Sequence, residues 1–253
     1  MTLGVESYVW LTAAAMLAGF IDSIAGGGGL ITVPALLASG LPPVNALATN
    51  KLQSVFSVAT AFWRYLRMGL IDVRRYIGVT AFIFACAMAG AWVVQRIPAD
   101  ALGKVMPVLI ICVVAYMVLS PRMTDDDSRA RLGLRGYAPV GGAIGFYDGF
   151  FGPGAGSFFT TSLVALKGMG LRRAAAHTKL FNLASNGAGV LLFMASGKTL
   201  WLLGFIMALG SISGAWIGSH LAIRHGARII RPLLILVSLA LTARLVWQNF
   251  GPG

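Results

Sequence analysis

The chain has 253 residues, of which 57% are hydrophobic and only 11% are charged, and its formal net charge is +12. This balance is typical of a protein that spans a membrane several times and argues against a soluble globular domain. The positive charge does not indicate a nucleic-acid partner, because the basic residues are divided among short loops and form no block. We therefore expect an integral membrane protein that lies in the lipid bilayer and binds no nucleic acid.

Ten apolar segments follow one another along the chain. A complete crossing of a bilayer needs about 20 helical residues, so the second and seventh segments are too short to cross alone. Each of them follows the preceding segment across a glycine-rich turn, which predicts a re-entrant hairpin or a broken helix. The segments span residues 8–24, 30–39, 45–63, 77–95, 102–120, 137–151, 155–166, 174–196, 200–221 and 229–248.

The two halves of the sequence repeat one unit. The repeated motifs contain an aspartate, several glycines and a lysine within apolar surroundings, and packing alone does not explain these residue types. The duplication predicts a first repeat over residues 1–120, a cytoplasmic linker over 121–136 and a second repeat over 137–253. The matched motifs are GFIDSIAGGGG at 19–29 with GFYDGFFGPGA at 145–155, ATNKLQS at 48–54 with AHTKLFN at 176–182, and Gly-Ala-Trp at 90–92 and again at 214–216.

The basic residues of the loops predict how the segments are oriented. If each glycine-rich pair of segments makes an even number of crossings, 14 of the loop lysines and arginines fall on one side and 3 on the other. Such an excess marks the cytoplasmic side and places both termini outside. Each repeat then makes an odd number of crossings, so the two copies are inverted relative to each other in the cytoplasmic membrane.

Asp22 and Asp148 are equivalent in the repeat and are the acidic residues that lie within apolar segments. An ionisable group at this depth is costly, and it usually faces a cavity or a partner. One interpretation is that each carboxylate caps the neighbouring turn by accepting hydrogen bonds from backbone N–H groups. A second interpretation is that the two residues take up a coupling proton, and the two roles are compatible.

The glycines that follow each aspartate expose backbone N–H groups at the start of a short helix. Together with the positive end of the helix dipole, such groups form an anion site. The alternative is that small residues allow close packing of helices, as they often do in membranes. The candidate substrate-binding glycines are Gly26, Gly28, Gly152, Gly154 and Gly156.

Lys51 and Lys179 are the second matched pair of buried charges, and each lies on a polar helix face. We expect these faces to line a pocket for an anion. The alternative is that the lysines form buried ion pairs with the repeated aspartates. His177 adjoins the second face, either as a proton-responsive group or as a packing residue. The polar faces contain Asn50, Lys51, Ser54 and Ser57 in the first copy and Thr178, Lys179, Asn182, Ser185 and Asn186 in the second.

Patterns that would indicate an enzyme or a metal site are weak. The sequence has no His-x-x-x-His or Cys-x-x-Cys pair, and Cys86 and Cys112 lie in apolar segments. We expect no catalytic residue, no cofactor and no metal. The catalytic alternative is an intramembrane aspartyl protease with Asp22 and Asp148 as its dyad, which leaves the matched lysines unexplained. A non-transporting assembly subunit is a third possibility, and it would not need polar helix faces.

The repeated motif GFxDxxxGxG, followed by a Thr-Lys or Asn-Lys pair, resembles the TauE/SafE sulfite exporter family, also called the toluene sulfonate uptake permease family. The resemblance extends from about Gly19 to the last helix and is strongest in GFYDGFFGPGAGSFF and HTKLFNLASN. It implies a permease for sulfite, sulfonates or related organosulfur or carboxylate anions, coupled to protons. The two copies differ where Pro153 replaces Gly27, Asn182 replaces Ser54 and His177 replaces Thr49.

We therefore predict an all-α integral membrane protein with two inverted repeats. Each repeat has a glycine-rich re-entrant or broken-helix element and three spanning helices. The expected function is secondary transport of a small anion by rocking of one repeat against the other. The sequence leaves the substrate, the direction of transport and the oligomeric state open, with a homodimer as one arrangement.

Overall fold

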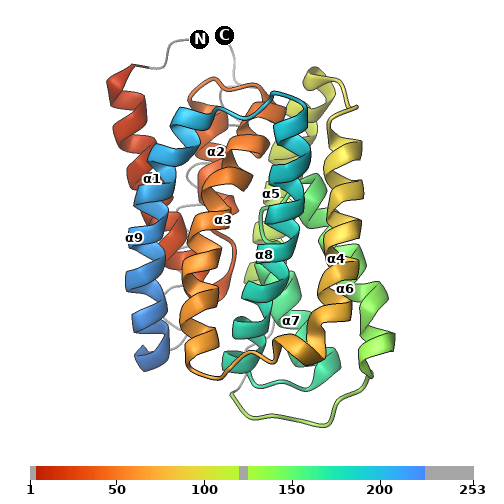
Figure 1. The fold of residues 1–253 in the computed structure, drawn as a ribbon. Helices are drawn as coiled ribbons and strands as arrows, with labels where there is room; N and C mark the ends of the chain where they lie inside the picture. The colour runs from red at the N-terminus through yellow and green to blue at the C-terminus, as the bar shows by residue number, and fades with distance from the viewer. Residues whose placement is uncertain (1–3, 120–124, 226–253) are drawn as a thin grey trace.

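The computed structural model describes residues 4–119 and 125–225, and within these ranges the chain forms nine α-helices and no strand (Figure 1). The all-helical prediction is confirmed for this part of the chain, whereas the predicted segment 229–248 lies outside the described residues. The helices are α1 (Val5–Ala25), α2 (Gly29–Ala38), α3 (Pro43–Arg67), α4 (Val73–Val94), α5 (Ala99–Leu119), α6 (Leu134–Phe150), α7 (Ala155–Lys167), α8 (Leu171–Ala195) and α9 (Trp201–His225).

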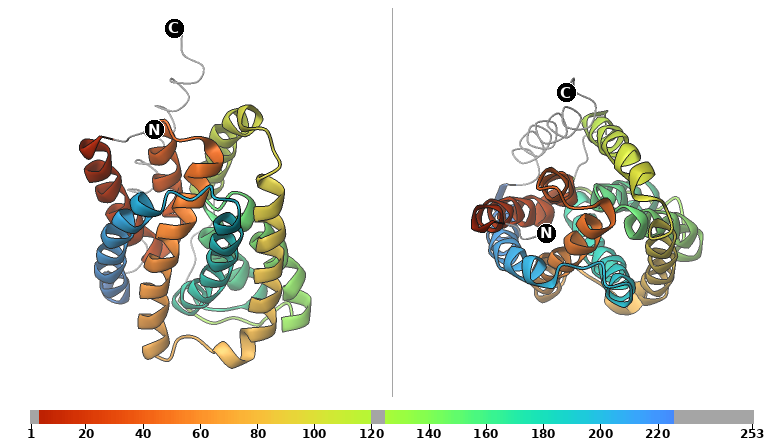
Figure 2. Two further views of the ribbon diagram at one scale, coloured as in Figure 1. Left: turned by 45° about the horizontal axis from the view of Figure 1, so that its top comes forward. Right: turned by 90° about the horizontal axis from the view of Figure 1, so that it is seen from above.

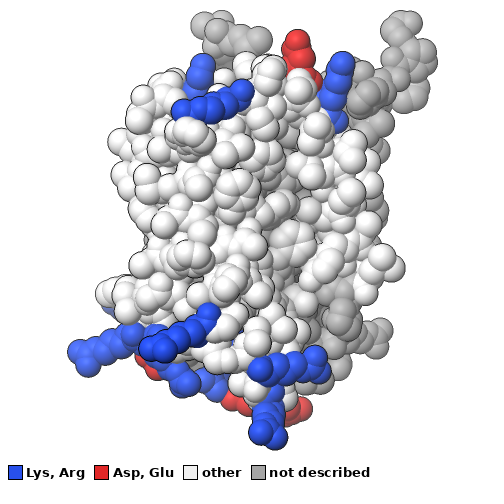
Figure 3. Space-filling view, turned by 90° about the vertical axis from the view of Figure 1, so that its right-hand side faces the viewer, with Lys and Arg blue, Asp and Glu red and all other residues white. Residues whose placement is uncertain are grey.

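Four of the described helices are long and apolar enough to cross a membrane, namely α1, α4, α5 and α9. Helices α3 and α8 are 25 residues long but do not belong to this group, because buried polar residues interrupt their apolar sequences. Figure 3 shows an uncharged band between two ends of the molecule, and lysine and arginine gather mainly at one of these ends. This surface suits a protein that crosses a bilayer several times.

Each half of the described chain begins with two helices joined by a glycine-rich turn. In α1 and α2, Leu11 and Leu36 share one buried cluster, so the end of α2 lies beside the first half of α1. In α6 and α7, the backbone N–H of Leu132, just before α6, donates to the carbonyl oxygen of Leu166, near the end of α7, at 2.9 Å. The second helix of each pair therefore returns toward the end of the molecule where the first began (Figures 1 and 2).

The two halves are interlocked by helix pairs that pack backbone against backbone. Helix α4 lies along α6, and α9 lies along α1 (Figure 2). A Cβ atom at Gly90 would lie 2.0 Å from the carbonyl oxygen of Phe146, and one at Gly214 would lie 1.9 Å from that of Met16. Gly90 and Gly214 are the glycines of the repeated Gly-Ala-Trp. The duplicated tripeptide thus makes one kind of contact twice, each time with the other half of the chain.

The described part of the linker binds the start of α8. Oδ1 of Asp125 accepts a hydrogen bond from the backbone N–H of Arg172 at 2.8 Å, and Oδ1 of Asp127 accepts one from Gly170 at 2.7 Å. Asp127 also forms an ion pair with Arg173. The hydrogen bond from Gly170, more than the ion pair, holds the pKa of Asp127 below its usual value. The two aspartates therefore cap α8 from a distant part of the sequence.

Candidate functional site

The two glycine-rich turns lie against each other inside the helix bundle. A Cβ atom at Gly26 would lie 2.7 Å from the carbonyl carbon of Gly156, and one at Gly156 would lie 2.9 Å from Cα of Gly26. Both turns also need glycine for their backbone, with φ of +74° at Gly26 and +98° at Gly152. At these positions glycine is therefore explained by close packing and by backbone conformation.

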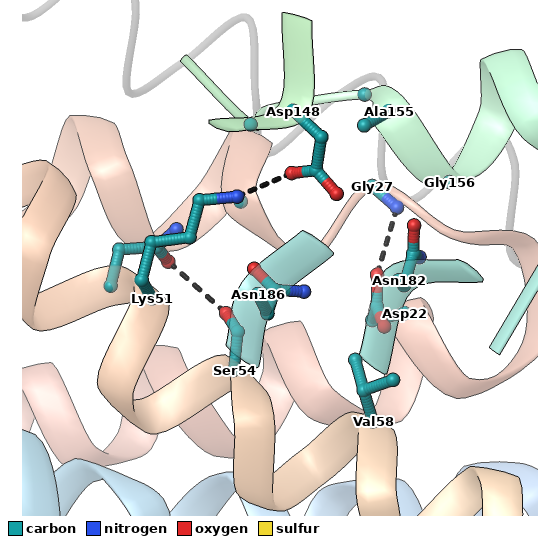
Figure 4. A pocket seen from close by; sticks show the side chains of 14 residues that line it. Asp22, Gly27, Lys51, Ser54, Val58, Asp148, Ala155, Gly156, Asn182 and Asn186 are labelled. Atoms are coloured by element: carbon teal, nitrogen blue, oxygen red, sulfur yellow. Dashed lines mark hydrogen bonds and ion pairs between the residues drawn. The ribbon is translucent and has the colours of Figure 1, made fainter. Parts of the chain in front are cut away.

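A cavity of about 30 Å³ lies between the two turns and helices α3 and α8 (Figure 4). A space of this size holds about one or two water molecules. Among the predicted substrate-binding residues, Asn50, Lys51, Ser54, Gly152, Gly154, Gly156, Asn182 and Asn186 line the cavity. Both predicted coupling aspartates, Asp22 and Asp148, line it as well.

The cavity wall and the list of individual predicted binding residues overlap only in part. The wall does not contain Gly26, Gly28, Thr178 or Lys179, whereas it does contain Gly27, Gly29, Val58 and Ala155. In the first turn the wall is thus formed by the glycines adjacent to the predicted ones. Which glycine faces the cavity depends on the backbone conformation of the turn, and the repeat pattern does not specify that conformation.

Lys51 of α3 and Asp148 of α6 form an ion pair in the cavity wall. Their side chains are 2% and 4% exposed. The hydroxyl group of Ser185, on α8, donates a hydrogen bond to the second carboxylate oxygen of Asp148. A Cβ atom at Gly152 would lie 3.2 Å from Nζ of Lys51, so the ammonium group lies directly against the second glycine-rich turn. Three helices thus hold one buried pair of opposite charges.

Asp22 is held differently, although it is the repeat equivalent of Asp148. Its Oδ1 accepts hydrogen bonds from the backbone N–H groups of Gly27 at 3.0 Å and Gly28 at 3.2 Å. Nζ of Lys179 donates to the backbone carbonyl oxygen of Asp22 and lies 3.4 Å from its Oδ2. The structure therefore shows a turn cap at Asp22, whereas Asp148 binds Lys51 and Ser185 instead.

Each lysine is paired with the aspartate of the other half of the chain. Lys51 belongs to the first half and contacts Asp148, while Lys179 belongs to the second half and contacts Asp22. The ion-pair interpretation of the lysines is therefore what the structure shows. An aspartyl protease dyad requires two carboxyl groups that share a proton, and here each carboxylate binds a lysine. The protease alternative finds no support in this arrangement.

A hydrogen-bonded pair of polar side chains also recurs in the two halves. Oγ1 of Thr32, on α2, lies 2.5 Å from Oδ1 of Asn50, and Oγ1 of Thr160, on α7, lies 3.0 Å from Oγ1 of Thr178. Each pair ties a short helix to the long helix that carries the lysine. The sequence reasoning missed Thr32 and Thr160, although each lies 18 residues before its partner on the long helix.

Asn182 brings an unsatisfied acceptor to the site. Its side chain lines the cavity and is 4% exposed, and its Oδ1 has no hydrogen-bond partner among the described residues. Buried polar atoms are almost always hydrogen-bonded to protein, water or a ligand. An amide group at this position can donate to an anion through its NH₂ group or accept from a water molecule through its oxygen.

His177 lies away from the cavity. Its Nε2 accepts a hydrogen bond from the backbone N–H of Asp72 at 3.2 Å, and its Nδ1 lies 2.9 Å from the carbonyl oxygen of Arg173. These partners fit a neutral imidazole with its proton on Nδ1. The ring also packs edge-on against Tyr76, with the ring centroids 4.6 Å apart.

Within residues 4–119 and 125–225, no group of three His, Cys, Asp or Glu side chains is placed to hold a metal ion.

Comparison with known proteins places this arrangement in a family. A family model described as "Sulfite exporter TauE/SafE" matches residues 11–245. The chain is 44% identical over 252 residues to the "Probable membrane transporter protein YfcA" of Escherichia coli strain K12, which covers 99% of this chain and 92% of that protein. It is 39% identical over 250 residues to a "Probable membrane transporter protein" of Haemophilus influenzae, which covers 98% of each chain.

A protein of a Sinorhizobium species, "Probable membrane transporter protein ORF9", is 43% identical over 244 residues, which cover 96% of this chain and 94% of that protein. No solved structure gives a significant match. The relatives match along almost their entire length, so the comparison concerns whole proteins. The described helices and the family match together show a multi-pass membrane protein. The chain belongs to the sulfite exporter TauE/SafE family of membrane transporters.

Proposed function

We propose that the protein is a proton-coupled secondary transporter of small anions in the cytoplasmic membrane. The proposed substrates are sulfite, sulfonates and related organosulfur or carboxylate anions. The observation that carries the proposal is the cavity between the two glycine-rich turns, because a lysine, three side-chain amides and the starts of two helices converge on it. The family name supports sulfur-containing anions as the first compounds to test.

Several groups of the cavity wall can bind a negative ligand, and the two carboxylates of the wall, Asp22 and Asp148, are each paired with a lysine. Helix α7 begins at Ala155 and α2 begins at Gly29, and both residues line the cavity. The helix dipole places partial positive charge at both helix starts, where the N–H groups of Ala155 and Leu30 donate to carbonyl oxygens of the turns. Lys51 adds a full positive charge, and Asn182 and Asn186 add amide donors. A non-transporting assembly subunit would not need such a buried polar site.

We infer that the two halves are inverted repeats whose glycine-rich turns lie within the membrane. In support, α1 begins at the upper end of the molecule in Figure 1, whereas α6 begins at the lower end. The lower end in Figure 3 carries most of the lysines and arginines, which supports a cytoplasmic position for this end and an outer position for the N-terminus. Alternating access would then come from rocking of one half against the other around the cavity.

The proposal is tested by uptake of a labelled sulfonate or of sulfite into proteoliposomes. We expect Lys51→Ala to lower uptake by about tenfold to a hundredfold, which corresponds to the loss of one hydrogen bond to a charged group. Lys179→Ala tests the second half of the site. The matched control is Lys198→Ala, which removes an exposed lysine in the loop before α9. Uptake that is unchanged in Lys51→Ala, Lys179→Ala and the double variant would contradict the assignment of the anion site.

A further inference from the structure

We propose that the transported anion takes the place of Asp148 on Lys51, and that Asp148 takes up one proton when it is displaced. This inference rests on the proposed transport of anions and extends it, because it names the coupling carboxyl group and the number of protons. It also assigns different roles to the two repeated aspartates: Asp148 would exchange its partner during transport, while Asp22 would remain a cap of its turn.

The first step of the argument is that Lys51 is the lysine that an anion in the cavity can reach. Lys51 lines the cavity, whereas Lys179 does not and donates to the backbone carbonyl oxygen of Asp22. The ammonium group of Lys51 lies against Gly152, beside the start of α7. An anion that enters the cavity beside Gly152 therefore lies next to this ammonium group and competes with Asp148 for it.

The second step concerns the balance of charge. In the structure the positive charge of Lys51 is matched by the negative charge of Asp148. A monovalent anion that enters this buried site adds a second negative charge to a single cation, which a site of low dielectric constant strongly disfavours. Protonation of the displaced carboxyl group removes this excess charge. The site then contains one cation, one bound anion and one neutral acid, so the net charge is again zero.

The third step is that the surroundings of Asp148 suit both of its protonation states. The hydroxyl group of Ser185 donates to the carboxylate in the structure, and the same oxygen can accept a hydrogen bond from a protonated carboxyl group. The titratable groups that share the cavity wall with Asp148 are Lys51 from α3 and Asp22 from α1. Lys179 from α8 is paired with Asp22, and Tyr147 precedes Asp148 on α6 itself. Helix α7 carries Lys167, which binds the linker at the far end of that helix.

The fourth step explains why Asp22 does not play the same part. Its carboxylate accepts two backbone N–H groups of its own turn, and this turn packs against Gly156. An anion that displaced Asp22 would have to open the turn and the contact between the two halves. The side chain of Asp148, by contrast, binds only the side chains of Lys51 and Ser185 among the described residues, so its displacement breaks no backbone hydrogen bond of its turn.

The experiment measures the binding of methanesulfonate to the purified protein by titration calorimetry. A sulfonate stays fully ionised at mildly acidic and mildly alkaline pH, so any pH dependence belongs to the protein. For the wild-type protein we expect one proton to be taken up per anion bound, read from the dependence of the binding heat on the ionisation enthalpy of the buffer. The apparent Kd should rise about tenfold per pH unit on the alkaline side.

Two matched variants separate the aspartates. In Asp148→Asn, methanesulfonate should bind without proton uptake, and its transport into proteoliposomes should move net negative charge. In Asp22→Asn, the amide oxygen can still accept from Gly27 and Gly28, so proton uptake should stay at one per anion. The proton count of the wild-type protein tests the proposal even if a variant does not fold.

The outcomes are distinct. Binding of methanesulfonate to the wild-type protein without proton uptake would overturn this inference and leave anion transport standing. Loss of proton uptake in Asp22→Asn, with retention in Asp148→Asn, would show that Asp22 takes up the proton. This result would also overturn the inference. If the wild-type protein neither binds nor transports sulfite, a sulfonate or a small carboxylate, the proposed function itself fails.

Discussion

Asp22 and Asp148 occupy equivalent positions in the duplicated sequence, yet they have different partners. Asp22 accepts hydrogen bonds from the N–H groups of Gly27 and Gly28, whereas Asp148 binds Lys51 and Ser185. The residue that corresponds to Gly27 in the second half is Pro153, which has no N–H group to donate. This replacement removes one of the two N–H donors of the cap; Gly154, the equivalent of Gly28, keeps its N–H group but makes no hydrogen bond to the Asp148 side chain among the described residues.

The second turn is held by another contact. The hydroxyl group of Tyr147 donates to the carbonyl oxygen of Pro153 at 2.6 Å, and the residue equivalent to Tyr147 in the first half is Ile21, which has no polar side chain. A tyrosine and a proline thus replace the aspartate cap. The comparison teaches that two copies of one motif can hold their turns by different contacts and give the equivalent aspartates different partners.

The largest effect that we expect comes from Lys51→Met, which leaves Asp148 as a buried charge without its cation. Removal of one member of a buried ion pair typically costs about 3–5 kcal/mol of stability. The double variant Lys51→Met with Asp148→Leu should recover most of this loss, because no unpaired charge remains. Chemical or thermal unfolding in detergent measures both changes.

Lys179→Met is the matched variant in the other half. We expect a smaller loss of stability, because Asp22 keeps its two backbone N–H partners and its side chain is 15% exposed. Equal losses for Lys51→Met and Lys179→Met would contradict the difference that we describe between the two aspartates.

The next prediction concerns the close helix contact that both halves make in the same way. Gly90→Ala and Gly214→Ala each place a Cβ atom within about 2 Å of a backbone carbonyl oxygen in the opposite half. Helices must move apart to accept it, and such overpacking costs about 1–3 kcal/mol. The control is Gly78→Ala on α4, where no atom of a neighbouring element lies within 4 Å of the new Cβ and helix propensity favours alanine. Thermal stability that falls equally in all three variants would argue against the interlocked packing.

A smaller effect is expected from Pro153→Gly, which restores an N–H group at the second turn. Loss of proline makes the unfolded chain more flexible and lowers the free energy of unfolding by about 0.4–1 kcal/mol. If the new N–H group binds Asp148, the carboxylate will be shared between the turn and Lys51, and proton uptake on sulfonate binding should fall. Proton uptake that stays at one per anion in this variant would mean that Pro153 does not determine the role of Asp148.

The smallest expected effect concerns the cap at the start of α8, which α3, the other helix with a buried lysine, does not have. Helix α3 begins with Pro43, whereas α8 is capped by Asp125 and Asp127 of the linker. The pKa of Asp127 is lower in the folded protein than in the unfolded chain. At a pH above the unfolded pKa, the ionised carboxylate therefore stabilises the docked linker. This contribution disappears as the pH falls through the folded pKa. For an exposed pair we expect less than about 1 kcal/mol.

The measurement for this prediction is the difference in stability between the wild-type protein and Asp127→Asn. The difference should be present at neutral pH and disappear in acid. Asp126→Asn changes the neighbouring exposed aspartate of the same linker and serves as the control. A difference between wild type and Asp127→Asn that grows as the pH falls would have the wrong sign.

The segments and the polar residues of the site could be predicted from the sequence for a simple reason. Ionisable and amide side chains within apolar segments are costly unless they gather, so Lys51, Asp148 and Asn182 mark the site before any fold is known. The helix bounds follow the apolar segments because a helix that crosses a bilayer must be apolar over most of its length.

Other features depend on contacts that no single segment contains. The crosswise pairing of Lys51 with Asp148 requires α3 of one half to pack beside α6 of the other. The position of Gly27 rather than Gly26 in the cavity wall depends on the φ and ψ angles of the turn. The loss of one cap donor at the second turn, by contrast, could have been predicted from Pro153, since proline has no N–H group wherever it occurs.

The crosswise contacts also bear on how the protein is made. A ribosome delivers Asp22 and Lys51 to the membrane before Lys179 and Asp148 have been synthesised, so neither charge of the first half finds its partner until the second half arrives. The surface of α1 that will receive Gly214 is likewise left uncovered during this interval. The nascent first half therefore carries Lys51 without Asp148, and Asp22 without Lys179, until the second half has been synthesised.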